Sequence, residues 1–223
     1  VARALNTVKK AIFDENVKKP LYILGLIVHN EKIKEALEHY GVISFDEPNM
    51  TRLKMVEKIN DGTVILSAHG TSPLVKERLK EKNIPFIDTT CIDVNKVHQQ
   101  ILNNKDEYEI VYIGKKNHPE VEGVLGLFED ITLISSLDDV KTFKKKTTKP
   151  LYVTNQTTLS LFEVLKVVSE LKKNHDLIFN SDICMATTKR QGAVIKQPKA
   201  DLLFVVGDNY SSNTNKLKEV SIK

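Results

Sequence analysis

Short apolar runs alternate with amphipathic segments along this chain. Apolar runs of about four to eight residues that end in polar loops are typical of buried strands in parallel sheets. Segments with apolar residues at helical spacing separate these runs. The expected strands are residues 21–28, 41–45, 63–66, 84–87, 109–114, 131–134, 151–153, 177–179 and 201–207. The expected helices are residues 2–13, 32–39, 75–82, 94–102, 124–128, 137–143, 161–171, 187–195 and 215–220.

This alternation predicts the α/β fold class, in which helices cover parallel sheets. In such folds the loops at the carboxyl ends of the strands form the ligand site. Loops rich in His, Ser, Thr, Asn and Glu follow the apolar runs of this chain. We therefore expect these polar loops to gather at one edge of each sheet.

Two cysteines lie in matching surroundings. Cys91 follows the expected strand 84–87, Cys184 follows the expected strand 177–179, and a helical pattern comes after each. Backbone N–H groups at a strand-to-helix junction favour the thiolate, which is the form that binds metal or attacks an electrophile. The alternative is a buried cysteine that acts as a small apolar side chain.

The cysteines belong to an internal repeat. Cys184 lies 93 residues after Cys91 (184 − 91 = 93), and the cations Arg3, Lys96 and Lys189 follow the same spacing. A fixed period indicates repeated structural modules. We expect a pseudo-threefold arrangement of three small parallel-sheet lobes, with the third incomplete in this chain. The expected boundaries are 1–90, 91–183 and 184–223.

The same spacing predicts a third cysteine three positions before Val1, outside this chain, so we expect its true start to be missing. Three thiolates from three modules could hold three irons of a cubane cluster and leave the fourth iron open. An open coordination position is what chemistry on a substrate requires. The alternative is a structural repeat whose cysteines bind nothing.

Charge and composition restrict the partners. The chain has 33 Lys+Arg against 29 Asp+Glu, a net charge of +4, and its lysine runs are typical of solvated surface. It has no basic stripe interleaved with aromatic residues, so we expect a small anionic ligand and no nucleic acid. The apolar runs are too short to cross a bilayer and no leader pattern is present, so we expect no membrane partner. Two cysteines so far apart form no disulfide framework, which indicates a reducing, cytoplasmic compartment.

Seven segments, in order and spread over essentially the whole chain, resemble the 4-hydroxy-3-methylbut-2-enyl diphosphate reductase family, the last enzyme of the methylerythritol phosphate route to isoprenoids. These segments are Val28-His29-Asn30, Ser67-Ala68-His69-Gly70, Asp88-Thr89-Thr90-Cys91, His118-Pro119-Glu120-Val121-Glu122-Gly123, Gln156-Thr157-Thr158-Leu159-Ser160, Asp182-Ile183-Cys184-Met185-Ala186-Thr187-Thr188-Lys189-Arg190-Gln191 and Ser211-Ser212-Asn213.

The resemblance implies a three-lobed α/β enzyme with a central 4Fe-4S cluster held by one cysteine per lobe. Cys91 and Cys184 would be two of its metal ligands. The implied reaction removes an allylic hydroxyl reductively, with two electrons and two protons, and forms isopentenyl and dimethylallyl diphosphates. The open iron would act as a Lewis acid on the leaving oxygen. A ferredoxin or a flavodoxin is the implied electron donor.

The resemblance also implies a role for Glu120 and Thr157. Glu120 would deliver a proton, since a carboxylic acid in a closed apolar pocket can keep its proton near neutral pH. The alternative is an ordinary acid in the first turn of a helix after Pro119. Thr157 would bond the substrate near the cluster, with Gln156 orienting it.

Six further residues are candidates for binding the diphosphate. His29, His69 and His118 would face it as neutral donors or as cations. The alternative for a histidine after a strand is a packed or solvent-facing side chain. Ser211, Ser212 and Asn213 would offer hydroxyl, amide and backbone donors. Their alternative is an ordinary helix N-cap.

Two other functional interpretations stay open. The chain could be a truncated, inactive fragment of such an enzyme, which would hold a cluster poorly with two of three cysteines. It could also be a non-redox α/β module that binds diphosphate and whose cysteines are structural. Diphosphate binding that survives replacement of Cys91 and Cys184 would distinguish this last interpretation.

Overall fold

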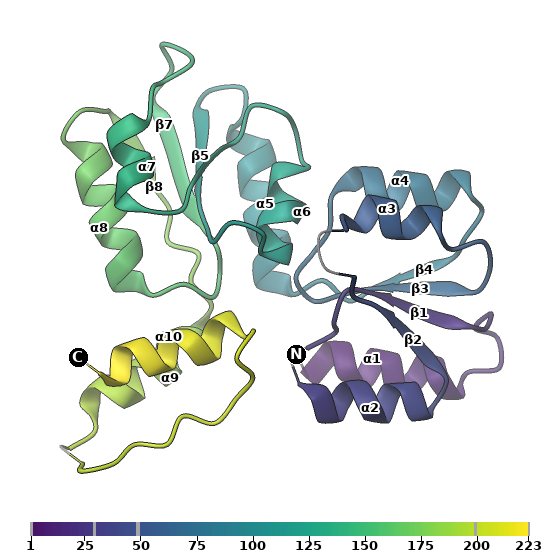
Figure 1. Cartoon of the computed structure of the whole chain (residues 1–223). Helices are drawn as coiled ribbons and strands as arrows, with labels where there is room; N and C mark the ends of the chain where they lie inside the picture. The colour runs from purple at the N-terminus through teal and green to yellow at the C-terminus, as the bar shows by residue number, and fades with distance from the viewer. Residues whose placement is uncertain (1, 29, 48–49, 199, 223) are drawn as a thin grey trace. The chain divides into compact units, whose positions relative to one another are not determined.

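The protein is an α/β protein with two four-stranded parallel sheets, as the sequence predicts (Figure 1). The structure is a computed structural model that describes residues 2–28, 30–47, 50–198 and 200–222. The chain divides into two compact units. Unit 1 comprises residues 1–95 and 122–127, and unit 2 comprises residues 96–121 and 128–223.

The sheet of unit 1 has the strand order β2-β1-β3-β4. Its strands are β1 (Leu21–Leu24), β2 (Val42–Phe45), β3 (Thr63–Leu66) and β4 (Phe86–Asp88). Its helices are α1 (Ala2–Phe13), α2 (Glu31–His39), α3 (Arg52–Glu57) and α4 (Pro73–Glu81). Helices α1 and α2 cover one face of the sheet, and α3 and α4 cover the other (Figure 1).

Alternate residues of the central strand β3 point to opposite faces of this sheet. Ile65 packs in the cluster that contains Val8 of α1, while Leu66 packs in the cluster that contains Val75 of α4. Because successive side chains alternate, a strand covered on both faces must be apolar throughout. This is why the run 63–66 predicted the position of β3.

The sheet of unit 2 repeats this topology in the order β6-β5-β7-β8. Its strands are β5 (Glu109–Ile113), β6 (Thr132–Ile134), β7 (Leu151–Asn155) and β8 (Leu177–Phe179). The remaining helices are α5 (Ile92–Asn104), α6 (Pro119–Leu125), α7 (Leu137–Thr142), α8 (Leu161–Lys172), α9 (Met185–Lys196) and α10 (Ser212–Ser221). The first residues of α5 and the last residues of α6 belong to unit 1.

Several elements differ from the expectations. The strand expected at 21–28 ends at Leu24. The segment 201–207 forms no strand, and Phe204 and Val206 are 79% and 93% exposed. A strand needs a neighbour to pair its N–H and C=O groups, and no strand of the described residues lies beside this segment. Helix α6 begins at Pro119 and not at residue 124, because proline is favoured in the first turn. Helix α3, which no pattern indicated, begins at a Thr51 side-chain cap.

Among the described residues, no helix combines the length and apolar character that crossing a membrane requires.

Candidate active site

The strand order creates a topological switch point in each sheet. The chain leaves β1 for β2 on one side and then returns to β3 on the other, and β5, β6 and β7 repeat this path. In open α/β sheets, ligands bind at the carboxyl ends of the strands beside such a point. His69 follows β3, His118 follows β5 and Thr157 follows β7, so all three lie in switch-point loops. His29 lies outside the described residues.

Glu120 is a buried carboxyl group in the first turn of α6. It is 1% exposed. Its Oε1 accepts a hydrogen bond from the Thr157 backbone N–H at 2.8 Å, and its Oε2 accepts one from the Thr157 hydroxyl at 3.0 Å. A buried glutamate is rare unless it is paired with donors. Its place in the first turn agrees with the helix-terminus alternative, but that alternative explains neither the burial nor the contacts with Thr157.

The loop after β7 links several predicted residues. The Gln156 amide nitrogen donates to the Thr158 hydroxyl at 2.8 Å, and the Gln156 amide oxygen accepts from the Lys115 N–H at 2.9 Å. The Thr158 hydroxyl in turn bonds the Ser212 hydroxyl at 3.2 Å. Gln156 therefore orients Thr158 directly, whereas the expected partner was Thr157. Residues 156–158 thus contact Glu120 on one side and the start of α10 on the other.

His69 and His118 each contact a residue two positions away in the sequence. His118 is buried, and its Nδ1 accepts the backbone N–H of Glu120 at 3.1 Å. A ring nitrogen that accepts carries no proton, so the neutral His118 ring carries its proton on Nε2. His69 is half-buried, with its Nδ1 3.5 Å from the Ser67 hydroxyl.

At the start of α10, the structure agrees with the N-cap alternative for Ser211. Ser211 caps the helix, because its hydroxyl accepts the Thr214 N–H at 3.3 Å. Ser212 is 7% exposed and bonds Thr158, as described above. The Asn213 side-chain oxygen is buried and has no hydrogen-bond partner within the described residues. The helix begins at Ser212, three residues earlier than expected.

Cys91 and Cys184 have equivalent positions in the two units. Each immediately precedes a helix, α5 or α9, and each is half-buried and free of a disulfide. The Cys91 N–H donates to the Ala68 carbonyl at 3.0 Å, and the Cys184 N–H donates to the Thr157 carbonyl at 2.9 Å. Both cysteines are therefore attached to the loop after the third strand of their sheet.

The surroundings of Cys184 suit a thiolate ligand. The Cys184 Sγ accepts the Thr187 N–H at 3.4 Å in the first turn of α9 and lies 2.9 Å from the Thr187 hydroxyl. Donors at a helix N-terminus stabilise the thiolate that an iron–sulfur cluster needs. The Cys91 thiol instead points to Asp93, with 4.0 Å between Sγ and Oδ2. No group of three or more His, Cys, Asp and Glu suited to a metal ion occurs in the described ranges.

Two of the repeated cations, Arg3 and Lys96, contact residues just before a cysteine. Arg3 of α1 donates to the carbonyl of Thr90, the residue before Cys91, at 2.5 Å. Lys96 of α5 lies 3.4 Å from the carboxylate of Asp182, two residues before Cys184. In each unit, the helix before the sheet thus contacts the loop that carries the cysteine.

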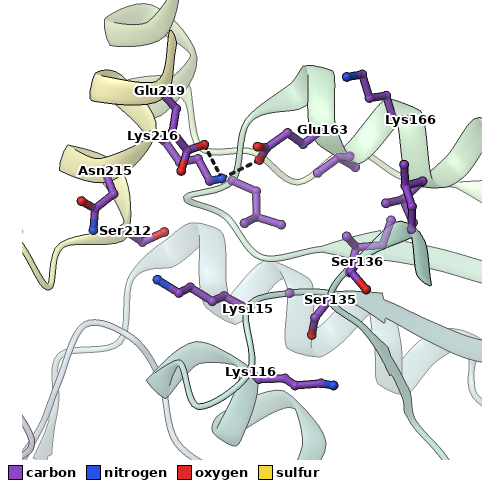
Figure 2. A pocket seen from close by; sticks show the side chains of 16 residues that line it. Lys115, Lys116, Ser135, Ser136, Glu163, Lys166, Ser212, Asn215, Lys216 and Glu219 are labelled. Carbon is purple, nitrogen blue, oxygen red and sulfur yellow. Dashed lines mark hydrogen bonds and ion pairs between the residues drawn. The ribbon is translucent and has the colours of Figure 1, made fainter. Parts of the chain in front are cut away.

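A cavity of about 560 Å³ lies in unit 2 beside Ser212 (Figure 2). Lys216 of α10 lines this cavity and pairs with Glu163 of α8 and Glu219 of α10, each at 2.7 Å. The amines of Lys115 and Lys116 point in different directions, so they do not converge on one anion (Figure 2). The main polar feature of this cavity is thus the ion pair that ties α10 to α8.

We expect Lys216→Met to destabilise α10. Because α10 carries Ser212 and Asn213, which are predicted to bind the diphosphate, we also expect KM for the diphosphate substrate to rise. The Lys216 side chain is only 16% exposed. Burial alone would lower the pKa of Lys216, but the hydrogen bonds that its amine donates to Glu163 and Glu219 outweigh burial and hold the pKa above its usual value. The contribution is therefore present at neutral pH and is lost only as the pH rises through that raised pKa. Thermal unfolding should show a loss of about 1–3 kcal/mol at pH 7.

The matched variant is Lys218→Met, which removes an exposed lysine from the same helix. It should change neither stability nor KM. If both variants unfold like the unsubstituted chain, the pair with Glu163 does not hold α10.

Two contacts of α6 were not predicted. Glu122 of α6 pairs with Arg52 of α3 at 2.8 Å, and Arg52 is 4% exposed. A Cβ added at Gly123 would lie 3.3 Å from the Thr71 backbone nitrogen, so glycine allows α6 to approach that loop closely. Glu122 and Gly123 thus hold the second half of α6 within unit 1. Glu120 and Glu122 thus have different partners, Thr157 and Arg52, and the run Glu120-Val121-Glu122 alone does not show this.

The repeated parallel sheets, with polar loops at their switch points, define an α/β protein of the ligand-binding type. Over residues 1–223 the chain matches the family described as LytB protein, and it belongs to that family. The resemblance carried by the seven sequence segments is therefore confirmed.

Two curated relatives are named 4-hydroxy-3-methylbut-2-enyl diphosphate reductase, which is an oxidoreductase. They come from Bacillus mycoides (strain KBAB4) and Bacillus cereus (strain B4264). Each is 47% identical over 225 residues, covering 99% of this chain and 70% of the relative.

Two solved structures have the same fold. The E-1-hydroxy-2-methyl-but-2-enyl-4-diphosphate reductase from Plasmodium falciparum is 36% identical with a TM-score of 0.88, covering 100% of this chain and 69% of that one. A structure titled (E)-4-hydroxy-3-methyl-but-2-enyl diphosphate reductase, the terminal enzyme of the non-mevalonate pathway, is 28% identical with a TM-score of 0.73, covering 99% and 76%.

Proposed function

We propose that this chain reduces 4-hydroxy-3-methylbut-2-enyl diphosphate to isopentenyl and dimethylallyl diphosphates. The observation that carries the proposal is the environment of Thr157. Its N–H and hydroxyl bond the buried Glu120, and its carbonyl bonds the Cys184 N–H. One residue thus contacts both the proposed proton donor and a proposed cluster ligand, and the names of the relatives supply the substrate class.

Cys91 and Cys184 would be two of the ligands of a 4Fe-4S cluster. Their half-buried thiols, each preceding a helix, fit thiolate ligation in their chemistry. When bound, this group would supply the electrons and polarise the oxygen that leaves. The three-module division at 1–90, 91–183 and 184–223 is part of the same proposal, with one cysteine contributed by each module.

Glu120 would supply the proton that turns the allylic hydroxyl into water. The reaction consumes two electrons and two protons, breaks the carbon–oxygen bond and forms a carbon–hydrogen bond. The Thr157 hydroxyl lies 3.0 Å from Glu120 Oε2 and would orient the substrate hydroxyl beside the acid. Glu120 would then recover a proton from solvent.

The remaining predicted residues would bind the diphosphate. His118 would donate from Nε2, because its Nδ1 already accepts the Glu120 N–H. Ser212 and Asn213 lie at the start of α10, where backbone N–H groups favour an anion. His29, His69 and Ser211 would complete this binding set. A ferredoxin or flavodoxin in the cytoplasm would deliver the electrons.

The test is an anaerobic assay of the protein expressed from its natural gene. Iron and sulfide would be measured first, and then the two diphosphate products after addition of a chemical reductant and substrate. We expect iron-loaded protein to form both products. Iron-loaded protein that forms neither product would overturn the proposed reaction.

A further inference from the structure

Tyr112 is a buried residue for which the sequence suggested no role. It is the fourth of the five residues of β5 and is 0% exposed. Its hydroxyl donates to Glu120 Oε1 at 3.1 Å. The other three residues that follow Glu109 in this strand are aliphatic. Tyr112 is therefore the only residue after Glu109 in β5 whose side chain can form a hydrogen bond. A buried tyrosine hydroxyl needs a partner, and here the partner is the proposed catalytic acid.

The position of the Tyr112 ring is fixed by its neighbours. A Cβ added at Gly114 would lie 3.0 Å from the ring and 2.6 Å from a methyl group of Val121 in α6. The ring and the first turn of α6 therefore fill the space above Gly114. Because this packing leaves the ring little freedom, the hydroxyl is held at Glu120 before any substrate binds.

The two oxygens of Glu120 have different partners. Oε1 accepts from the Tyr112 hydroxyl and from the Thr157 backbone N–H, which can only donate. Oε2 bonds the Thr157 hydroxyl, which can accept as well as donate. A proton on Oε2 can therefore be passed into a hydrogen bond. A proton on Oε1 would break the bond from the Thr157 N–H and would require the Tyr112 hydroxyl to turn from donor to acceptor.

We propose that Tyr112 is a positioning residue for Glu120: its hydroxyl reserves Oε1 as an acceptor, directs the transferable proton to Oε2 and weakens the hold of Glu120 on that proton. This inference rests on the proposed function of Glu120. A donor to a carboxylate favours the charged form, so it makes the neutral acid a stronger acid.

The charged surroundings are consistent with this role. Burial, and then the negative charge of Glu120, raise the pKa of Tyr112 well above its usual value, so the hydroxyl remains a donor throughout the working range. Asp182 also faces Tyr112, but Lys96 pairs with its carboxylate. His118, just before α6, accepts the Glu120 N–H on its ring, and Glu122 of α6 is paired with Arg52.

The first test is Tyr112→Phe, with Tyr152→Phe as the matched control. Tyr152 is a buried tyrosine on the neighbouring strand β7. Activity that needs the acid form of Glu120 is lost as the pH rises. For Tyr112→Phe this alkaline limb should therefore move up by about 0.5–1 pH unit, with kcat about 3–10-fold lower and KM unchanged. Tyr152→Phe should leave both the limb and kcat in place.

The second test does not depend on activity. The infrared C=O band of the protonated Glu120 carboxyl, assigned by its loss in Glu120→Gln, should persist to higher pH in Tyr112→Phe. Site-specific 3-fluorotyrosine at position 112 keeps the ring but is a stronger donor, so both readouts should move to lower pH. This second variant serves if Tyr112→Phe does not fold.

An unchanged carboxyl band in both variants, or shifts of the same sign, would overturn the inference. If the chain has no reductase activity but the carboxyl band still shifts in opposite directions in the two variants, the proposed function is wrong. The inferred effect of Tyr112 on Glu120 would then still hold.

Discussion

Glu120→Gln should lower kcat by about 10²–10⁴-fold and leave the fold intact. Glutamine cannot deliver a proton, yet its amide oxygen can still accept the Thr157 N–H bond that Glu120 accepts at 2.8 Å. KM should change little, because the carboxyl group is proposed to act in the proton step and not on the diphosphate. The measurement is product formation by iron-loaded variant under anaerobic conditions, with iron content determined in the same sample.

The chain offers a closely matched control at the other end of β5. Glu109 is 5% exposed and, like Glu120, accepts both the backbone N–H and the hydroxyl of one threonine, Thr147. Glu109→Gln should therefore cost about 1–3 kcal/mol of stability without affecting kcat. Equal losses of kcat in the two variants would mean that the effect comes from disturbing a buried carboxylate and not from proton transfer.

The sequence predicts most strongly those features that depend on local pattern. Residues 63–66 form a strand as expected, because a strand buried on both faces needs a continuous apolar run. Residues 177–179 also form the expected strand, although it lies at the edge of its sheet and is only half-buried. The matching contexts of Cys91 and Cys184 likewise predicted two helix starts, and both occur. The failure at 201–207 has the complementary cause, since strand propensity is not realised without a neighbouring strand.

Contacts between distant residues could not be predicted in this way. The bond between Tyr112 and Glu120 depends on how α6 packs over β5, and a tyrosine in an apolar strand is compatible with many partners. Lys216 resembles any surface lysine until Glu163 of another helix is brought beside it. Such pairs arise from tertiary packing, and the local pattern of each residue carries no information about its partner.

Replacing Cys91 or Cys184 by serine should reduce the iron content of anaerobically assembled protein to background and abolish reductase activity. Serine is a poor thiolate substitute, and each cysteine is proposed to supply one ligand of the same cluster. The equivalent backbone anchors, to Ala68 and Thr157, predict losses of equal size for the two variants. Neither thiol belongs to a hydrophobic core cluster, so the free energy of unfolding should change by less than about 1 kcal/mol.

Met185→Ala is the control for these variants, because it removes an exposed sulfur next to Cys184. It should keep its iron and its activity. A decisive contrary result would be iron and activity retained in both cysteine variants, which would make the cysteines structural. Diphosphate binding that persists when iron and activity are lost would show that anion binding by α10 and the histidine loops is independent of the cluster. Loss of iron in one variant alone would break the equivalence that the 93-residue repeat predicts.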